Sequence, residues 1–123
     1  MNGRKLKGRI LLVDDNFNDR YWYGNLLQEA GYEVEVAEGW GKSLDKINQI
    51  QPDLIITELA MPDRDEITTL FELMFYSYAD IPVVIHTGHS SKTITCGAQG
   101  YVKKSPDCKP LIEEVQKIIG KSH

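Results

Sequence analysis

Short runs of branched apolar residues alternate along the chain with longer segments that are apolar on one side only. Five of these runs have the length and composition of strands: residues 9–13, 32–37, 54–59, 83–87 and 100–103. The runs at 9–13 and 54–59 are almost continuously apolar, which is typical of strands buried on both faces of a sheet. In 32–37, valines alternate with Glu33 and Glu35, which indicates an edge strand with one wet face.

The intervening segments carry apolar residues at helical spacing and predict the helices. The first helix starts in the polar stretch 16–19 and ends at Gly31, and Pro52 prevents the second helix from continuing. Asp107 is expected to cap the last helix, which ends at Gly120. The helical segments are 16–31, 40–50, 67–74 and 107–120.

Strand and helix therefore alternate along the chain, and this alternation predicts an α/β fold with a doubly wound, five-stranded parallel sheet and helices on both faces. Residues 88–99, twelve in all, connect the last two strands. A parallel crossover including its helix needs about ten to twelve residues. The fourth helix is therefore expected to be shortened to a turn or two, or replaced by a loop.

Composition and charge narrow the classes of function. The chain has 14 Lys and Arg against 18 Asp and Glu, a net charge of −4, which argues against nucleic-acid binding. The 123 residues suit one domain, expected at 9–120, with an N-terminal extension (1–8) and a C-terminal tail (121–123). Because the sequence has no pattern of a signal peptide or membrane span, we expect a cytoplasmic protein with Cys96 and Cys108 reduced.

Polar side chains lie at or just after the expected ends of four of these strands: Asp14, Asp15, Glu58, Thr87 and Lys104. The carboxyl ends of parallel strands meet at one edge of the sheet, so these residues are expected to form one site. Three converging carboxylates need a cation or must protonate one member, and their oxygens suit Mg²⁺. A divalent ion, a lysine and a hydroxyl around a carboxylate are the parts that stabilise a phosphoryl group in transfer.

Several motifs follow one another in an order that occurs in a known family. They are ILLVDD at 10–15, PDLII at 52–56 leading into MP at 61–62, TG at 87–88, GA at 97–98, and YVKK at 101–104. Their joint occurrence is specific, and the chain from about Arg9 to Ile119 resembles the receiver domain of bacterial response regulators. The resemblance implies a flavodoxin-like receiver fold and a role in two-component or phosphorelay signal transduction.

The resemblance also implies a role for each matching residue. Asp14, Asp15, Glu58 and the backbone carbonyl of Ala60 match the Mg²⁺ site, Thr87 and Lys104 match the phosphoryl contacts, and Tyr101 matches the switch aromatic. Each residue taken singly has a structural interpretation as well: the two aspartates can cap the first helix, Tyr101 can be core, and Lys104 can be a surface charge. Similarly, His86 is interpreted as a packed residue of its strand, since no Cys or His lies beside it at metal-ligand spacing.

The main departure from the family is Glu58, which stands where the family has its phosphoacceptor aspartate. Glutamate is longer by one methylene, so its carboxylate lies about 1.5 Å further out, and a displacement of that size spoils in-line transfer. Glu58 then either imitates the phosphorylated state by contacting Lys104 and Thr87 or leaves an inert site. A second departure is Ser105, where the family typically has a proline joined by a cis bond; here either the loop has changed or the strain is retained.

The sequence therefore predicts a stand-alone, atypical receiver domain that signals by docking to a histidine kinase or a downstream effector, with phosphorylation absent or inefficient. Mg²⁺ binding is not required for this function, and a homodimer is left open. One alternative is a working phosphorelay receiver that accepts phosphate at Glu58 or at Asp63 or Asp65. A small Mg²⁺-dependent phosphohydrolase-like enzyme is the other, disfavoured because no nucleophile with an adjacent base lies near the strand ends, so no enzymatic activity is expected.

Overall fold

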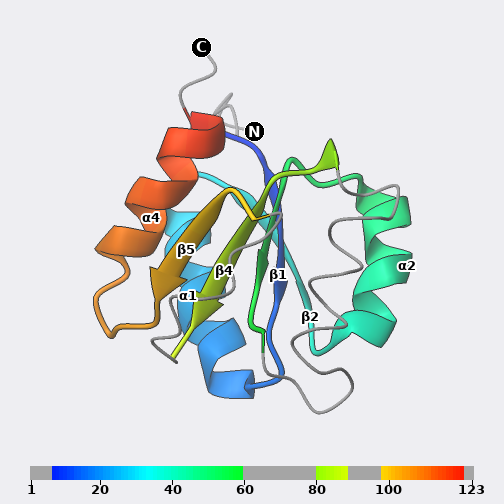
Figure 1. Cartoon of the computed structure of the whole chain (residues 1–123), viewed down its shortest axis with the longest axis horizontal. Coiled ribbons are helices and arrows are strands. Elements are labelled where there is room, and N and C mark those ends of the chain that lie inside the picture. The colour runs from blue at the N-terminus through cyan, green and yellow to red at the C-terminus, as the bar shows by residue number, and fades with distance from the viewer. Residues whose placement is uncertain (1–6, 60–79, 89–97, 121–123) are drawn as a thin grey trace.

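Five parallel strands form the centre of the molecule, with helices on both faces (Figure 1). The computed structural model describes residues 7–59, 80–88 and 98–120. The strands are β1 (Arg9–Val13), β2 (Glu33–Ala37), β3 (Leu54–Thr57), β4 (Val83–Thr87) and β5 (Gly100–Lys103). Their order in the sheet is β2-β1-β3-β4-β5, so the predicted doubly wound parallel sheet is confirmed.

The burial of the strands follows their sequence pattern. All residues of β3 and β4 are buried, as is β1 apart from Arg9, which agrees with their nearly continuous apolar sequences. β2 lies at the edge of the sheet as predicted, with Glu33 and Glu35 half-buried. Its apolar side is less covered than the alternation predicted, because the side chain of Val36 is 39% exposed.

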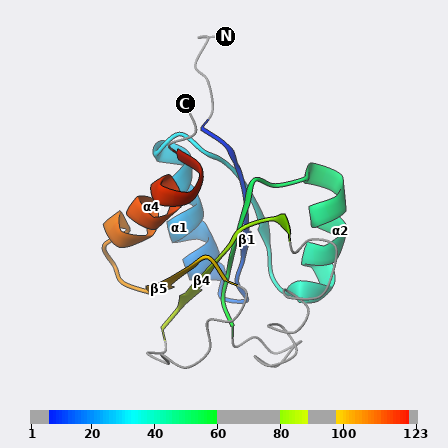
Figure 2. The ribbon, with the colours of Figure 1, turned by 45° about the horizontal axis from the view of Figure 1, so that its top comes forward.

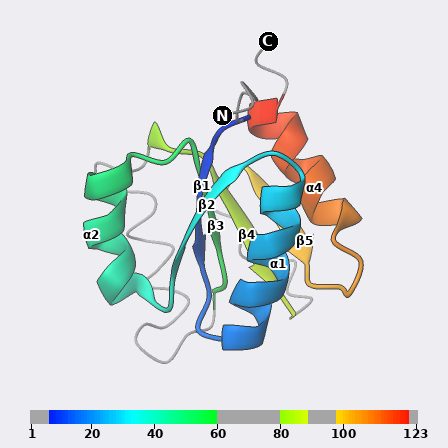
Figure 3. The ribbon, with the colours of Figure 1, turned by 180° about the vertical axis from the view of Figure 1, so that it is seen from behind.

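The helices pack in two layers. α1 (Phe17–Glu29) and α4 (Lys109–Val115) lie side by side on one face, and α2 (Trp40–Ile50) covers the other (Figures 1 and 3). In the tilted view of Figure 2 the sheet separates α1 and α4 from α2. The core on the first face includes Leu12, Leu27, Ile56, Leu111 and Val115, and the core on the α2 face includes Leu11, Val13, Ile47, Ile55 and Ile85.

The helix ends have local causes. α1 begins after Asn16, whose side-chain oxygen accepts a hydrogen bond from the backbone N–H of Asp19 at 2.9 Å. Gly31, with a φ of +108°, follows the end of this helix as predicted. α2 ends at Gln51 in the left-handed conformation, directly before Pro52.

The start of α4 differs from the sequence-based prediction. The N-cap residue is Cys108 rather than Asp107, and its side chain makes no capping hydrogen bond. The Asp107 carboxylate instead accepts from the backbone N–H of Lys109 at 3.0 Å, so the expected acid still satisfies a free donor of the first turn from one position upstream. α4 continues as a π-helical turn, η2 (Gln116–Gly120), and ends at Gly120 as expected.

Some expected features lie outside the described residues. These are the helix at 67–74, most of the 88–99 crossover with its shortened helix, and the loop that holds Ala60, Asp63 and Asp65. Within 7–59, 80–88 and 98–120, no helix is long and apolar enough to cross a membrane.

Candidate functional site

The order of the sheet brings the carboxyl ends of β1 and β3 together at its centre. Val13 of β1 is in register with Thr57 of β3, so Asp14 and Glu58 follow paired residues. The backbone N–H of Glu58 donates to the carbonyl of Val13 at 2.9 Å. Hydrogen bonds of this kind extend the ladder one residue past the strands and place both carboxylates at the same edge.

β4 and β5 deliver the lysine in the same way. Thr87 is in register with Lys103, and the backbone N–H of Lys104 donates to the Thr87 carbonyl at 2.7 Å. Thr87 is 1% exposed and stands at the end of a fully buried strand. The main chain therefore places Lys104 and Thr87 beside each other at the edge that carries Asp14 and Glu58.

The Lys104 ammonium is the centre of the site. Its Nζ lies within ion-pair distance of three carboxylate oxygens: 2.7 Å from Asp14 Oδ2, 2.7 Å from Asp19 Oδ2 and 2.9 Å from Glu58 Oε1. An ammonium has three N–H donors, so each can meet one carboxylate. Burial by itself lowers the pKa of Lys104, but the hydrogen bonds to the three carboxylates outweigh it and raise the pKa above its usual value.

The two buried carboxylates are also held by backbone N–H groups. Asp14 Oδ1 accepts from the N–H of Asn16 at 2.9 Å, and Glu58 Oε2 accepts from the N–H of Leu59 at 2.8 Å. Burial raises the pKa of Asp14, although Lys104 and the Asn16 N–H act in the opposite direction. Through Lys104 and these two N–H groups, both oxygens of each carboxylate have a partner within the protein.

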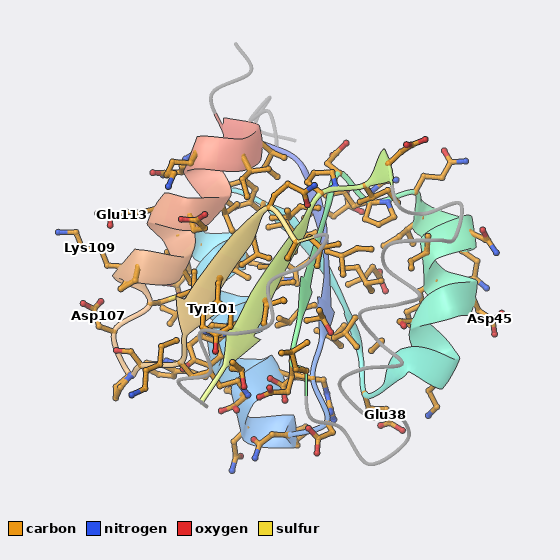
Figure 4. The ribbon with its side chains drawn as sticks, viewed as in Figure 1. Glu38, Asp45, Tyr101, Asp107, Lys109 and Glu113 are labelled. Atoms are coloured by element: carbon orange, nitrogen blue, oxygen red, sulfur yellow. The ribbon has the colours of Figure 1, made fainter. Side chains whose placement is uncertain are left out.

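The other predicted site residues lie in different surroundings. Asp15 is exposed, and no hydrogen bond or ion pair joins it to the part of the chain that the structure describes. Tyr101 lies on β5 (Figure 4) and packs half-buried against the core on the α2 face. This position agrees with the interpretation of Tyr101 as a core residue, and its role as a switch stays a prediction.

Asp19 is the member of the site that the sequence did not reveal. It lies in the first turn of α1, five residues after Asp14, and the sequence places it only in the polar start of that helix. The only sign in the sequence that Asp19 belongs to the site is its spacing from Asp14. This spacing allows the residue after the strand and a residue in the first turn of the next helix to approach the same point. Whether they do depends on how α1 packs on the sheet.

Comparison with known proteins identifies the family. The sequence matches the response regulator receiver domain over residues 10–116. The chain belongs to this family. The Treponema pallidum chemotaxis protein CheY is 28% identical over 95% of this chain and 88% of its own length.

A solved receiver structure shows the same fold. Response regulator TrrA from Thermotoga maritima, in complex with Mg²⁺–BeF, is 32% identical, with a TM-score of 0.80 over 89% of this chain and 97% of that one. The match to the Vibrio cholerae sensor kinase/phosphatase CqsS, at 32% identity, covers 87% of this chain. Several of these curated relatives are much longer proteins, and the receiver domain spans 17% to 30% of their length.

The donor chemistry of this receiver domain suits the hard cation that the family implies. Asp14, Asp15 and Glu58 offer carboxylate oxygens, which Mg²⁺ prefers. In the described geometry, however, Lys104 and backbone N–H groups hold the oxygens of Asp14 and Glu58. Among residues 7–59, 80–88 and 98–120 no three His, Cys, Asp or Glu side chains stand in a metal-binding group. The residue types fit the ion, and its binding would require them to exchange partners.

A buried layer below the site joins α1 to the segment after β5. Tyr23 donates its hydroxyl hydrogen to the carbonyl of Ser105 at 2.8 Å, and its ring meets His86 edge-on at 4.5 Å between centroids. His86 is therefore packed, as predicted, and is 2% exposed. The bond between Lys104 and Ser105 is trans, so the loop has changed relative to the family pattern.

His86 is expected to make the stability of the domain depend on pH. Its Nδ1 is buried and has no hydrogen-bond partner in the described part of the chain. Burial, with the positive charge of Lys104, lowers the pKa of His86 from 6.5 to about 4. The unfolded chain therefore binds more protons between these values, and folded stability falls as the pH drops through that window.

The test of this prediction is the variant His86→Phe, which keeps an aromatic ring against Tyr23. Relative to this variant, the wild type should lose about 2–3 kcal/mol of unfolding free energy between pH 7 and pH 4.5. Urea denaturation at pH 7 and pH 4.5 measures the unfolding free energy of both proteins. Subtracting the value of the variant from that of the wild type cancels the pH-dependent contributions that both proteins share, such as that of Asp14. A constant difference between wild type and variant across this range would contradict the prediction.

Proposed function

We propose that this receiver domain signals without ordinary phosphoryl acceptance, because the Glu58 carboxylate already serves as the anionic partner of Lys104. The supporting observation is the 2.9 Å ion pair between Glu58 Oε1 and Lys104 Nζ, in a position where the Glu58 side chain is only 9% exposed. The lysine that would hold an incoming phosphoryl group is thereby engaged. Of the two interpretations of Glu58, the first is preferred: it stands in for the phosphoryl group on Lys104.

The second oxygen of Glu58 supports the same proposal. An acceptor carboxylate must present a free oxygen in line with the bond that breaks, with Lys104 on the transferring group. Here Glu58 Oε2 faces the backbone N–H of Leu59 at 2.8 Å. Transfer would require Glu58 to leave both partners, and its extra methylene would still place the oxygen about 1.5 Å beyond the aspartate position.

Mg²⁺ is proposed as an optional ligand rather than a requirement. Asp14 and Asp15 would hold it, together with Glu58 if this side chain leaves Lys104. When bound, the ion would neutralise carboxylate charge at the sheet edge. Lys104 already supplies a positive charge there, so the fold does not depend on the ion for this purpose.

Signalling then depends on protein contacts. Receiver domains act with histidine kinases and effector proteins, and we propose a partner of this kind here. α1 supports the proposal because it exposes three aromatic side chains, with Phe17 68%, Tyr21 65% and Trp22 49% exposed. Trp22 lines a surface cavity of about 520 Å³ between α1 and the start of α4. Exposed aromatics of this kind are enriched at protein interfaces.

The direct test is intact-mass measurement of the wild-type protein after incubation with Mg²⁺ and acetyl phosphate. We expect no stoichiometric phosphoryl adduct, because Glu58 and Lys104 neutralise each other. TrrA, a family member of known structure, would be treated in parallel to show that the donor is active. One phosphoryl group per wild-type molecule would overturn the proposal and favour a working phosphorelay receiver.

A further inference from the structure

We propose that Asp19 is a positioning residue that holds Lys104 in place and must release it before the ammonium can bind an incoming anionic group. Asp19 lies on α1, outside the family motifs. The part that concerns phosphoryl transfer rests on the proposed function of Glu58. The part that concerns the hold on Lys104 stands on geometry alone.

Lys104 has no N–H donor to spare. Its three N–H groups face three carboxylates within 2.9 Å, of which Asp19 at 2.7 Å is as close as any. A phosphoryl oxygen could reach Lys104 only by displacing one of them. Asp19 thus adds a competitor to a lysine that Asp14 and Glu58 already engage.

The three carboxylates differ in how easily Lys104 can release them. The side chains of Asp14 and Glu58 are 3% and 9% exposed, so releasing either one leaves a buried charge without its cation. The side chain of Asp19 is 31% exposed, and water can solvate its carboxylate once it turns away. Asp19 is therefore the partner that Lys104 releases most easily, and the two buried acids are held more firmly.

The position of Asp19 is fixed by α1. The Asn16 side chain accepts from the Asp19 N–H at 2.9 Å, and the Asn16 N–H donates to the Asp14 carboxylate at 2.9 Å, so that the first turn is joined to the residue that directly follows β1. One turn later, Tyr23 donates to the Ser105 carbonyl at 2.8 Å. The same helix face therefore holds the Lys104 side chain and the backbone of the next residue, so that a shift of α1 would change the hold on Lys104.

The first measurement follows the Lys104 ammonium by NMR in wild type, Asp19→Asn and Asp19→Ala. We expect the Lys104 ammonium protons to exchange with water about three- to tenfold faster in Asp19→Ala, because one charged acceptor is lost. A smaller increase is expected in Asp19→Asn. Asp45→Asn is the matched control, since Asp45 is an exposed acid that points away from the fold on α2 (Figure 4). A merely structural role of Asp19 would lower the melting temperature without this selective change at Lys104.

The second measurement uses the Glu58→Asp background with Mg²⁺ and acetyl phosphate. Freeing Lys104 in Glu58→Asp/Asp19→Ala should raise the rate of phosphoryl adduct formation about three- to tenfold over Glu58→Asp alone. This range corresponds to Asp19 holding the lysine in most molecules. Glu58→Asp/Asp45→Asn should react at the rate of Glu58→Asp.

The outcomes separate this proposal from the proposed function. Unchanged exchange at Lys104 in both Asp19 variants overturns the present inference, whatever Glu58→Asp does. If Lys104 exchanges faster but the adduct rate of the double variant does not rise, the release step is overturned and the role of Glu58 stands. If Glu58→Asp takes no phosphate while Asp19→Ala frees Lys104, the hold by Asp19 is supported, and the proposal that Glu58 prevents transfer fails.

Discussion

Glu58→Asp is expected to gain one phosphoryl group per molecule when it is incubated with Mg²⁺ and acetyl phosphate, whereas the wild type gains none. The shorter side chain withdraws its carboxylate by about 1.5 Å, toward the position that in-line attack requires. Lys104, Thr87 and Asp14 stay in place, because hydrogen bonds of the sheet edge hold the first two and the Asn16 N–H holds the third. Intact-mass spectrometry measures the adduct.

The control for this experiment is Glu58→Gln, which keeps the length of glutamate and removes its charge. It loses the ion pair with Lys104 but offers no nucleophilic oxygen, so it should stay unmodified. An adduct on Glu58→Gln would place the acceptor elsewhere, and peptide mapping would then examine Asp63 and Asp65. If Glu58→Asp gains no phosphoryl group, the length of the side chain at position 58 is not what prevents transfer.

Lys104→Met is expected to cause the largest loss of stability, about 3–5 kcal/mol of unfolding free energy at pH 7.5. The variant leaves three carboxylates around an apolar side chain, two of them on side chains that are less than 10% exposed. Burial raises the pKa of Asp14 even with Lys104 present, and removing the ammonium takes away the main opposing charge, so protonation of Asp14 stabilises the folded state of the variant. The deficit relative to wild type should therefore shrink as the pH falls from 7.5 to 5.

Urea denaturation at the two pH values measures this effect, with Lys42→Met as the matched control. Lys42 forms a 2.6 Å ion pair with Glu38, but its side chain is 67% exposed, so its loss should change the unfolding free energy by less than about 1 kcal/mol. A similar, small change in both variants would show that the Lys104 cluster does not stabilise the fold.

Much of the fold could be predicted because each strand is a short apolar run with clear limits. The limits of β4 and β5 agree with the prediction to the residue, since Pro82 precedes one and Gly100 begins the other. β3 ends at Thr57, two residues before the end of its apolar run. The carboxyl ends of these strands then determine the edge where the site lies, without any knowledge of side-chain direction.

The finer arrangement of the site could not be predicted, because it depends on side-chain torsions and on the packing angle of α1, which the local sequence does not determine. Asp14 and Asp15 are the same residue type at adjacent positions, yet Asp14 is 2% exposed beside Lys104, whereas Asp15 is exposed. Asp19 reaches Lys104 across 85 positions of sequence only because α1 lies over the sheet at the required angle. Likewise, the contact of Glu58 with the N–H of its neighbour Leu59 is a choice of side-chain torsion.

The main-chain hydrogen bonds at the sheet edge have a consequence for how such a domain can diverge. The peptide N–H groups of Glu58 and Lys104, which bond to the carbonyls of Val13 and Thr87, set these positions without reference to the side chains they carry. An acceptor aspartate can therefore be exchanged for glutamate in one mutational step without refolding the scaffold. The main chain therefore sets the shape of this edge, and the side chains set its chemistry. A receiver domain can lose phosphoryl acceptance while it keeps the surface that partners recognise.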